Sequence, residues 1–227
     1  MKEMKNAKEL IGNAQLTITY LRHSIKGPDG NLSEEGITKA SDLDIHIRSN
    51  SNVKIYTSDI QRSIDTGKII GRKFKISDPT IAPILSEFPY TDEKIEELGL
   101  SGGKWLLVES ASKLLAAKIA KFTLDILESK TPNKNDHVIA ISHVPPIMAF
   151  LGHVLAHSAG KRTIDEEIKA KLFESFDGFV KPPEGFEIIY DQNSKDFISV
   201  IFAKDNVQVP ISFLQTFTNR SGSPSTD

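Results

Sequence analysis

The 227-residue chain contains no cysteine. This absence excludes disulfide bonds, thiolate metal sites and a cysteine nucleophile. No apolar run approaches the length of about 20 residues that a membrane-spanning helix needs. The first residues, MKEMKNAKELIGNAQ, are charged and lack the apolar stretch of a signal peptide. We therefore expect a cytoplasmic protein.

The chain also lacks a strong bias of charge. Charged residues make up 26% of the sequence, yet the formal net charge is only -2. Such a balance gives no reason to expect nucleic acid or a membrane surface as a partner, so any basic site must be local. With 39% hydrophobic residues the chain can bury a core. Its length fits one α/β domain with an insertion, or two small domains.

Three strand-like runs each end on polar residues that can bind or attack phosphate. These runs and the residues that follow them are Leu16–Leu21 with Arg22 and His23, Val53–Thr57 with Ser58 and Arg62, and Val138–Ser142 with His143. In open α/β sheets, ligands bind outside the carboxyl ends of the strands. The pattern therefore predicts one anion site assembled from distant segments.

Helix-starting signals follow all three of these runs. Ser33 precedes two glutamates and predicts a helix N-cap. Ser58 and Gln61 have the spacing of a capping box, which would place Arg62 on the first turn of a helix, where anions bind readily. Pro145 and Pro146 directly after His143 suit the first turn of another helix.

Alternating strands and helices predict a three-layer α/β/α sandwich with a mostly parallel sheet. The segment of about 83–135, which includes the strongly helical Leu106–Leu127, interrupts the alternation and predicts a helical cap over the carboxyl edge of the sheet. Near the end, Phe186–Tyr190 and Phe197–Phe202 flank a polar turn and predict a hairpin at the sheet edge. We expect a single domain over 1–219 and a disordered polar tail over 220–227.

The combination of LRH at a strand end, then TSDIQRSIDTGKII, then VIAISH resembles the histidine phosphatase superfamily, which includes the cofactor-dependent phosphoglycerate mutases. The resemblance extends from about Leu16 to Ala149, with a weaker echo in the final hairpin. It implies that His23 takes the phosphoryl group and becomes phosphohistidine, with Arg22 and Arg62 binding the phosphate oxygens. It also implies that the second histidine, His143, donates to the phosphoryl group during transfer, and that Glu87 is the proton donor.

The chemistry of these side chains agrees with the implied roles. Phosphoryl transfer depends mainly on positioning and charge neutralisation, and two guanidinium groups bind phosphate oxygens through charge-assisted hydrogen bonds. A neutral imidazole is nucleophilic near pH 7, and a hydrogen bond from its other ring nitrogen to a backbone carbonyl would fix its tautomer. No metal or cofactor is required, because the arginines and His143 neutralise the charge.

The sequence departs from the family pattern in two places. The family commonly has glycine after the nucleophilic histidine, whereas this chain has Ser24, whose hydroxyl we expect near the phosphate, where it can contribute a hydrogen bond. The mutases carry an Asn-containing loop after the histidine and a Gly-rich, aromatic motif after the acid. The corresponding stretches here, SIKGPDGNLSEEG and FPYTDEKIEEL, match neither and favour a phosphatase.

Several alternatives stay open. The chain could be a mutase-like phosphotransferase, or a phosphate-binding protein without turnover. Nearby carboxylates compete with Glu87 for the role of acid, namely Glu93, Glu96 and Glu97. The partner expected from the resemblance is a small phosphorylated substrate or a phosphoprotein, and the oligomeric state is open. His153 and His157 have the i, i+4 spacing of metal ligands, but no carboxylate completes a motif, so a partly exposed helix face is expected.

Overall fold

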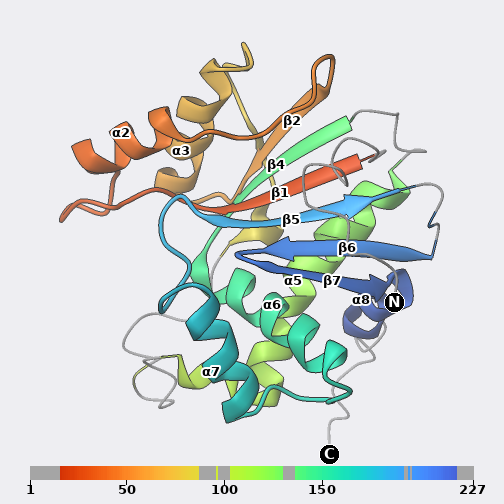
Figure 1. Ribbon diagram of the computed structural model, residues 1–227. Helices are drawn as coiled ribbons and strands as arrows, with labels where there is room; N and C mark the ends of the chain where they lie inside the picture. The colour runs from red at the N-terminus through yellow and green to blue at the C-terminus, as the bar shows by residue number, and fades with distance from the viewer. Residues whose placement is uncertain are drawn as a thin grey trace, which may run out of the picture.

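The computed structural model describes residues 16–86, 96, 103–129, 136–191, 194 and 196–218. Its centre is a seven-stranded sheet with the order β3-β2-β4-β1-β5-β6-β7 (Figure 1). The strands are β1 (Leu16–Arg22), β2 (Asn52–Thr57), β3 (Thr80–Ile81), β4 (Asp136–Ser142), β5 (Gly185–Tyr190), β6 (Phe197–Phe202) and β7 (Asp205–Pro210).

The sheet has a parallel half and an antiparallel half. Strand β4 pairs in parallel with both β1 and β2, and β2 pairs in parallel with β3. Strand β5 then joins β1 in the antiparallel direction, and β6 and β7 continue the antiparallel pattern. The mostly parallel sheet expected from the sequence is thus a mixed sheet whose parallel part carries the three strand ends of interest.

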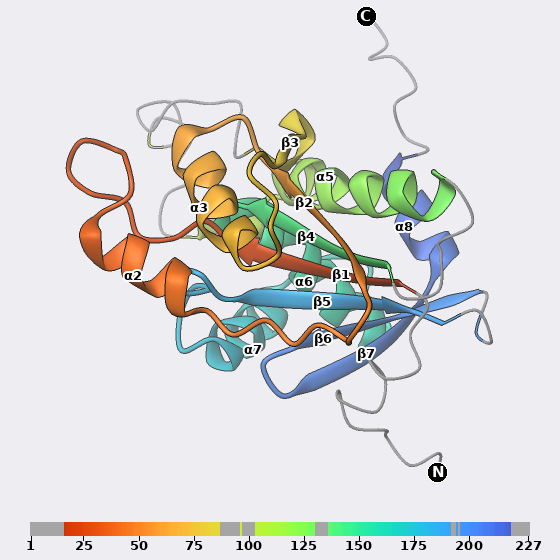
Figure 2. The same ribbon diagram turned by 90° about the horizontal axis from the view of Figure 1, so that it is seen from above.

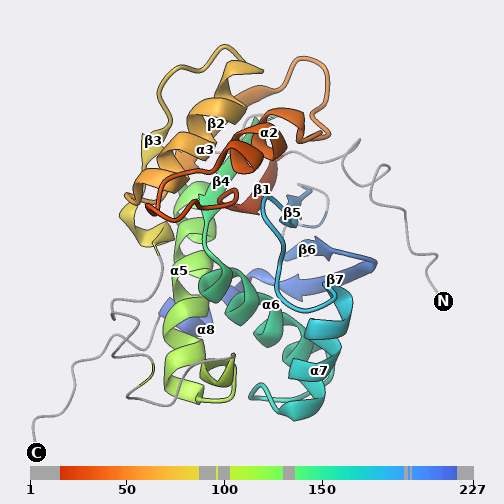
Figure 3. The ribbon, with the colours of Figure 1, turned by 90° about the vertical axis from the view of Figure 1, so that its left-hand side faces the viewer.

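Helices cover both faces of the sheet, which confirms the predicted sandwich. The helices are α2 (Glu34–Asp42), α3 (Gln61–Arg72), α5 (Glu109–Glu128), α6 (Val144–Ser158), α7 (Glu166–Ser175) and α8 (Ile211–Thr218), with short 3-10 turns η1 (Pro83–Leu85) and η2 (Lys104–Leu106). Figure 3 shows α2 and α3 on one side of the sheet and α5 and α6 on the other. Helix α8 packs beside α5 (Figure 2).

Alternating side chains of β1 pack into two separate hydrophobic cores, one on each face of the sheet. Ile18 and Tyr20 point into the larger core with α5 and α6, where the Tyr20 ring stacks on Phe186 with ring centroids 4.8 Å apart. Leu21 points to the opposite face and packs with Ile70 of α3. Because successive strand residues face opposite sides, both layers are held by one strand. The polar residues that follow β1 are therefore anchored from two directions.

The predicted strands before the polar residues are confirmed as β1, β2 and β4. Ser33 is the N-cap of α2, and its hydroxyl accepts a hydrogen bond from the Gly36 amide at 3.0 Å. The capping box at Ser58 and Gln61 is wrong. Helix α3 begins at Gln61 with Ile60 as N-cap and no side-chain cap. The reason is that the buried Ser58 hydroxyl bonds a distant histidine and the Gln61 amide donates to Asp65.

The cap expected over about 83–135 needs a correction. Part of this segment lies outside the described residues, and its main helix, α5, belongs to the layer on the sheet face. Ile119 and Phe122 of α5 are buried, and the Tyr20 hydroxyl of β1 bonds Thr123 at 2.7 Å. The apolar residues of Leu106–Leu127 therefore indicated a core helix and not a cap helix.

The predicted C-terminal hairpin is confirmed as β5 and β6. It does not form the edge, because β7 pairs with β6 and lies outside it. The tail over 220–227 lies outside the described residues. Among the helices that the structure describes, none is long and apolar enough to span a membrane.

Candidate active site

The carboxyl ends of β1, β2 and β4 meet on the side of the molecule that faces the viewer in Figure 3. The backbone joins them directly. The His23 amide donates to the Ser142 carbonyl at 3.0 Å, and the Ser58 amide donates to the Ile141 carbonyl at 3.1 Å. These bonds continue the parallel ladders beyond the strands. They hold the residues after β1 and β2 against the end of β4, as the sequence pattern predicted.

The His23 ring is fixed through both nitrogens. Its Nδ1 lies 2.7 Å from the Ser24 carbonyl oxygen, and the Arg62 Nε donates to its Nε2 at 2.9 Å. A carbonyl only accepts, so Nδ1 carries the proton and Nε2 presents its lone pair. The backbone-carbonyl bond expected from the sequence is therefore present. It makes Nε2 the nucleophilic nitrogen.

His143 stands beside His23, with ring centroids 5.0 Å apart. It is the N-cap residue of α6, and Pro145 and Pro146 follow in the first turn as predicted. Its Nε2 lies 2.8 Å from the Ser58 hydroxyl, which is fully buried and also accepts a long bond from the Ile60 amide at 3.4 Å. Because the Ser58 oxygen accepts from the Ile60 amide, its own proton is available for a hydrogen bond to the His143 Nε2. This arrangement favours the Nδ1–H tautomer of His143.

Both imidazoles are neutral at physiological pH. Burial is the main cause that lowers the pKa of His23 to about 3; the charges of His143, Arg62 and Arg22 contribute, and the bond to the Ser24 carbonyl opposes the shift. Burial likewise lowers the pKa of His143 to about 3, with Arg62 and Lys118 adding to the effect. Since a protonated imidazole has no lone pair to attack with, these shifts keep His23 in its nucleophilic form.

Two arginines supply positive charge beside the histidines. Arg62 lies in the first turn of α3 and contacts His23 directly. The Arg22 Nη1 donates to the Val180 carbonyl at 2.8 Å, which aims the guanidinium group. Its Nε is buried and has no hydrogen-bond partner among the described residues. Burial, followed by the charge of Arg62, lowers the pKa of Arg22. Two half-buried arginines, one bonded to His23 and the other close enough for its charge to lower the pKa of His23, form a site for an anion.

The expectation that the Ser24 hydroxyl binds phosphate does not fit the contacts. Ser24 is fully buried, and its hydroxyl donates to the Gly36 carbonyl of α2 at 2.7 Å. Its backbone amide donates to the Thr66 hydroxyl of α3 at 3.0 Å. Ser24 therefore ties the loop after His23 to both helices on this face, and its single hydroxyl proton is already used.

Three further residues surround His143, and the sequence analysis missed them. Lys118 of α5 donates to the Ser86 carbonyl at 2.9 Å, and the Ser86 hydroxyl bonds the Asp59 carboxylate. Lys118 lowers and Asp59 raises the pKa of His143. Asp59 was readable from the TSDIQR segment, but Lys118 comes from a helix with no sequence signal linking it to the site.

The candidate acids fall mainly beyond the described part of the chain. Glu87 lies outside the described residues, as do Glu93 and Glu97, so their positions relative to His23 stay predictions. Glu96 is described and is exposed. Glu87 directly follows Ser86, which is itself bonded to Asp59 and Lys118 beside His143.

The histidine pair on α6 is structural. His153 is buried, contrary to the partly exposed face that was expected, and its Nε2 lies 3.2 Å from the Ser112 hydroxyl of α5. The His157 ring packs on Phe213 of α8 with centroids 4.7 Å apart. Within the residues that the structure describes, no three His, Asp or Glu side chains are grouped so that they could hold a metal ion.

Comparisons with known proteins agree with this geometry. A family model described as the histidine phosphatase superfamily (branch 1) matches residues 19–98. Among curated proteins, no sequence matches this chain.

Solved structures share the fold at low sequence identity. A mycobacterial glucosyl-3-phosphoglycerate phosphatase complexed with VO3 is 14% identical, with 83% of this chain and 99% of that chain covered at a TM-score of 0.54. A putative alpha-ribazole-5'-P phosphatase from Escherichia coli is also 14% identical, with 84% and 96% covered at a TM-score of 0.54. A protein called mycobacterial hydrolase 1 is 15% identical, with 84% and 99% covered at a TM-score of 0.51.

The chain therefore has the fold of the histidine phosphatase superfamily. The match of the family model over residues 19–98 confirms the resemblance predicted from the sequence. At sequence identities of 14–15%, the solved structures show a shared fold and nothing about the reaction. The reaction must be argued from the side chains.

Proposed function

We propose that this protein is a metal-independent phosphomonoester hydrolase that acts through a phosphohistidine intermediate at His23. The observation that carries the proposal is the His23 ring, buried and neutral, with its Nε2 lone pair held 2.9 Å from the Arg62 Nε. A nucleophile whose attacking atom already touches a phosphate-binding group is arranged for phosphoryl transfer.

Substrate binding is the first step of the proposed reaction. The phosphate dianion takes the place of the His23 ring as partner of the Arg62 guanidinium group, while Arg22, held by Val180, binds other oxygens of the same phosphate. Release of Arg62 from Nε2 frees the lone pair at the moment when the phosphorus atom arrives. Charge-assisted hydrogen bonds from two arginines then neutralise the phosphoryl oxygens.

Phosphoryl transfer follows. The His23 Nε2 forms a bond to phosphorus, the bond from phosphorus to the ester oxygen breaks, and the leaving alcohol takes a proton from a general acid, for which Glu87 is the proposed donor. A positioned acid is worth about 10²–10⁴-fold in rate. The His143 Nδ1–H donates to the phosphoryl group in transit, because its Nε2 is bound to Ser58.

Hydrolysis of the phosphohistidine completes the cycle. The carboxylate left after the first step takes a proton from water, the water oxygen attacks phosphorus, and the bond from phosphorus to His23 Nε2 breaks. Inorganic phosphate leaves, the acid is protonated again, and His23 returns to its neutral form. The bond from Nδ1–H to the Ser24 carbonyl persists throughout and stabilises the positive charge of the phosphorylated ring.

Hydrolysis is favoured over a mutase reaction by two observations. The stretches after His23 and after Glu87 lack the motifs of the mutases. Two of the structures that share the fold with a TM-score of 0.54 carry phosphatase names. The substrate is proposed to be a small phosphate ester or a phosphoprotein, and the protein is proposed to act in the cytoplasm.

Hydrolysis of p-nitrophenyl phosphate with EDTA present tests the proposal. We expect turnover by the wild type and a loss of at least about 10³-fold in His23→Ala. Glu35→Ala, an exposed change on α2, is the control and should keep full activity. Equal turnover by His23→Ala and wild type would refute the proposal. Activity that disappears with EDTA and returns with a divalent metal ion would refute its metal independence.

A further inference from the structure

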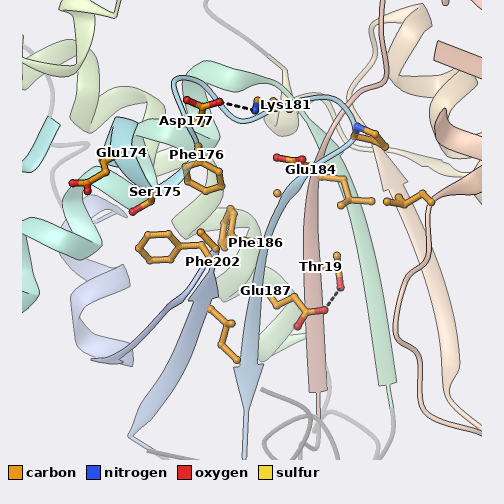
Figure 4. Close-up of a pocket in the computed structure, with 16 residues that line it drawn as sticks. Thr19, Glu174, Ser175, Phe176, Asp177, Lys181, Glu184, Phe186, Glu187 and Phe202 are labelled. Atoms are coloured by element: carbon orange, nitrogen blue, oxygen red, sulfur yellow. Dashed lines mark hydrogen bonds and ion pairs between the residues drawn. The ribbon is translucent and has the colours of Figure 1, made fainter. Parts of the chain in front are cut away.

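A cavity of about 550 Å³ lies on the face of the sheet that carries α2, apart from the proposed active site (Figure 4). Its lining comes from β1, β5 and β6, from the end of α2 and from the segment 174–185. None of the side chains of Arg22, His23, Arg62 or His143 lines it. A volume of this size falls in the range of about 300–1,000 Å³ that is typical of small-molecule sites.

The strand register explains why the cavity exists. Thr19 pairs with Glu187 across β1 and β5, and Glu187 pairs with Ile201 across β5 and β6, so these three side chains share one face. Helix α3 packs over β2 and β4 on this face and leaves β5 and β6 to the end of α7 and the irregular connection 176–184. An irregular segment fills such a surface less completely than a helix does.

The lining is acidic. It contains the carboxylates of Glu174, Asp177, Glu184 and Glu187 against the single ammonium group of Lys181. That ammonium group pairs with Asp177 at 3.1 Å. Within the described part of the chain, the other three carboxylates have no ion pair. The cavity therefore holds an excess of negative charge beside apolar side chains such as Leu21 and Leu43.

Glu187 is the half-buried carboxylate of this group. Its one hydrogen bond from the described residues comes from the Thr19 hydroxyl at 3.3 Å (Figure 4), and the same hydroxyl lies 2.8 Å from the His137 Nε2. The Thr19 hydroxyl has one proton. It can donate that proton to the Glu187 carboxylate only when the His137 Nε2–H donates to the Thr19 oxygen. Burial raises the pKa of Glu187, while Thr19 and the charge of His46 lower it. A cation inside the cavity would supply the partner that this carboxylate lacks.

We propose that this cavity binds a small organic cation, an ammonium group on an apolar or aromatic body, with Glu187 as its anchor. The ammonium group lies against Glu187 at the sheet, and the apolar body lies along Leu21, Leu43 and the ring of Phe176. Glu184 at the exposed rim adds attraction for a second positive charge.

The cavity wall is also the segment that holds Arg22. The Val180 carbonyl accepts from the Arg22 Nη1 at 2.8 Å, and the Glu184 carbonyl accepts from the Arg22 amide at 2.9 Å. A ligand that orders residues 174–185 therefore also orders the guanidinium group that is proposed to bind phosphate. This coupling rests on the proposed function, whereas the binding site itself does not.

Calorimetric titration of the full chain with 2-phenylethylamine at pH 7 tests the site. We expect saturable binding, no binding of the anion 3-phenylpropanoate, and a loss of at least about 10-fold in affinity in Glu187→Gln. His23→Ala should bind the amine as the wild type does, because His23 does not line the cavity. Absence of saturable binding to wild type, or equal affinity in Glu187→Gln, would overturn the proposal.

A second variant tests the site independently, in case Glu187→Gln does not fold. Ile201→Lys places an ammonium group beside Glu187 across the β5–β6 pair, where it should block the amine while circular dichroism stays unchanged. Amine binding that survives in this variant would contradict the assignment to Glu187.

The coupling has its own readout. A saturating amine should lower the KM for p-nitrophenyl phosphate by about 5-fold in wild type and leave it unchanged in Glu187→Gln. The amine should also tighten vanadate binding by about 5-fold, and vanadate should tighten amine binding by that same factor, because coupling between two binding sites is reciprocal. Amine binding without either change would retain the site and refute the coupling. An inactive enzyme that still binds the amine would count against the proposed function and not against the site.

Discussion

At the scale of single residues, the site depends on which nitrogen of each imidazole carries the proton. His23 presents Nε2 because Nδ1 faces the Ser24 carbonyl, and His143 presents Nδ1 because Nε2 faces Ser58. In the proposed reaction, these two neutral rings of opposite tautomer supply a nucleophile and a hydrogen-bond donor to the same anion. Their histidine identities and strand-end positions were readable from the sequence. The tautomer of His143 was not, because Ser58 lies 85 positions from His143 in the chain.

The neutral state of His23 can be measured directly. In the phosphate-free protein we expect the ring resonances of His23 and His143 to show no titration between pH 8 and about pH 5, since burial lowers both pKa values to about 3. An ordinary histidine would titrate with a midpoint near about 6.5. Nuclear magnetic resonance of wild type, assigned with His23→Asn, gives the curves. A midpoint near the ordinary value would contradict the desolvated site.

Ser58 is expected to act as a positioning residue. In Ser58→Ala the bond to the His143 Nε2 is lost, the two tautomers mix, and kcat should fall by about 10-fold with little change in KM. Nitrogen-15 shifts of His143 would show the mixture, and Ser58→Thr, which keeps the hydroxyl, should restore both the shifts and the rate. A fall in kcat with unchanged nitrogen-15 shifts would assign Ser58 a packing role instead.

At the scale of elements, the sequence predicted what depends on local pattern. Strands β1, β2 and β4 and the cap at Ser33 follow from alternation, β-branched residues and helix-start chemistry. Strand β7 and helix α8 were not predicted. The alternation in DNVQVP covers only two apolar residues, so this run is too short to indicate a strand without β6 as its partner. The role of α5 was misread for a related reason, because a helix with buried residues can serve a core or a cap equally well.

Helix α2 contacts the loop that follows His23, the proposed nucleophile. A Cβ on Gly36 would collide with the Ile25 carbonyl, and the Gly36 carbonyl accepts from the Ser24 hydroxyl at 2.7 Å. Gly36→Ala should therefore push the loop away from α2, with a loss of about 1–3 kcal/mol in the free energy of unfolding and at least about 10-fold in kcat/KM. Urea titration and p-nitrophenyl phosphate kinetics measure the two effects.

Glu35→Ala is the matched control on the same helix. Its side chain is exposed and pairs with Lys39 at 3.1 Å, so removal should cost well under about 1 kcal/mol and leave the kinetics unchanged. If Gly36→Ala behaved like Glu35→Ala, the close contact between α2 and the loop would have no part in holding His23.

At the scale of the whole molecule, buried histidines make the fold sensitive to acid. His23, His137, His143 and His153 are all buried, and burial lowers their pKa values to about 3 or 4. In the unfolded chain each histidine titrates near about 6.5. Between pH 3 or 4 and about pH 6.5 the unfolded chain binds more protons than the folded protein, so the free energy of unfolding rises with pH. The stabilisation from keeping these histidines neutral is complete above about pH 6.5 and is lost progressively below it. Glu187, whose pKa is raised, opposes the trend in part.

We therefore expect the free energy of unfolding to fall by up to about 1.4 kcal/mol per pH unit for each buried histidine below pH 6.5. Urea titrations between pH 7.5 and about pH 5 measure the slope. His137→Gln should reduce this slope by the contribution of one histidine, whatever the substitution does to the stability at neutral pH. A stability that stays constant or rises as the pH falls from 7 to 5 would show that these histidines are not held neutral.

The proposed function depends above all on a covalent bond from His23 to phosphorus. The most direct test is to mix the protein with p-nitrophenyl phosphate, quench within milliseconds into alkali, where phosphohistidine survives, and map the modified peptide by mass spectrometry. We expect one added phosphoryl group on His23, which is absent from His23→Ala and accumulates when Glu87→Gln slows hydrolysis. Turnover of the ester with no phosphoryl group on His23, or with the group on another residue, would contradict it.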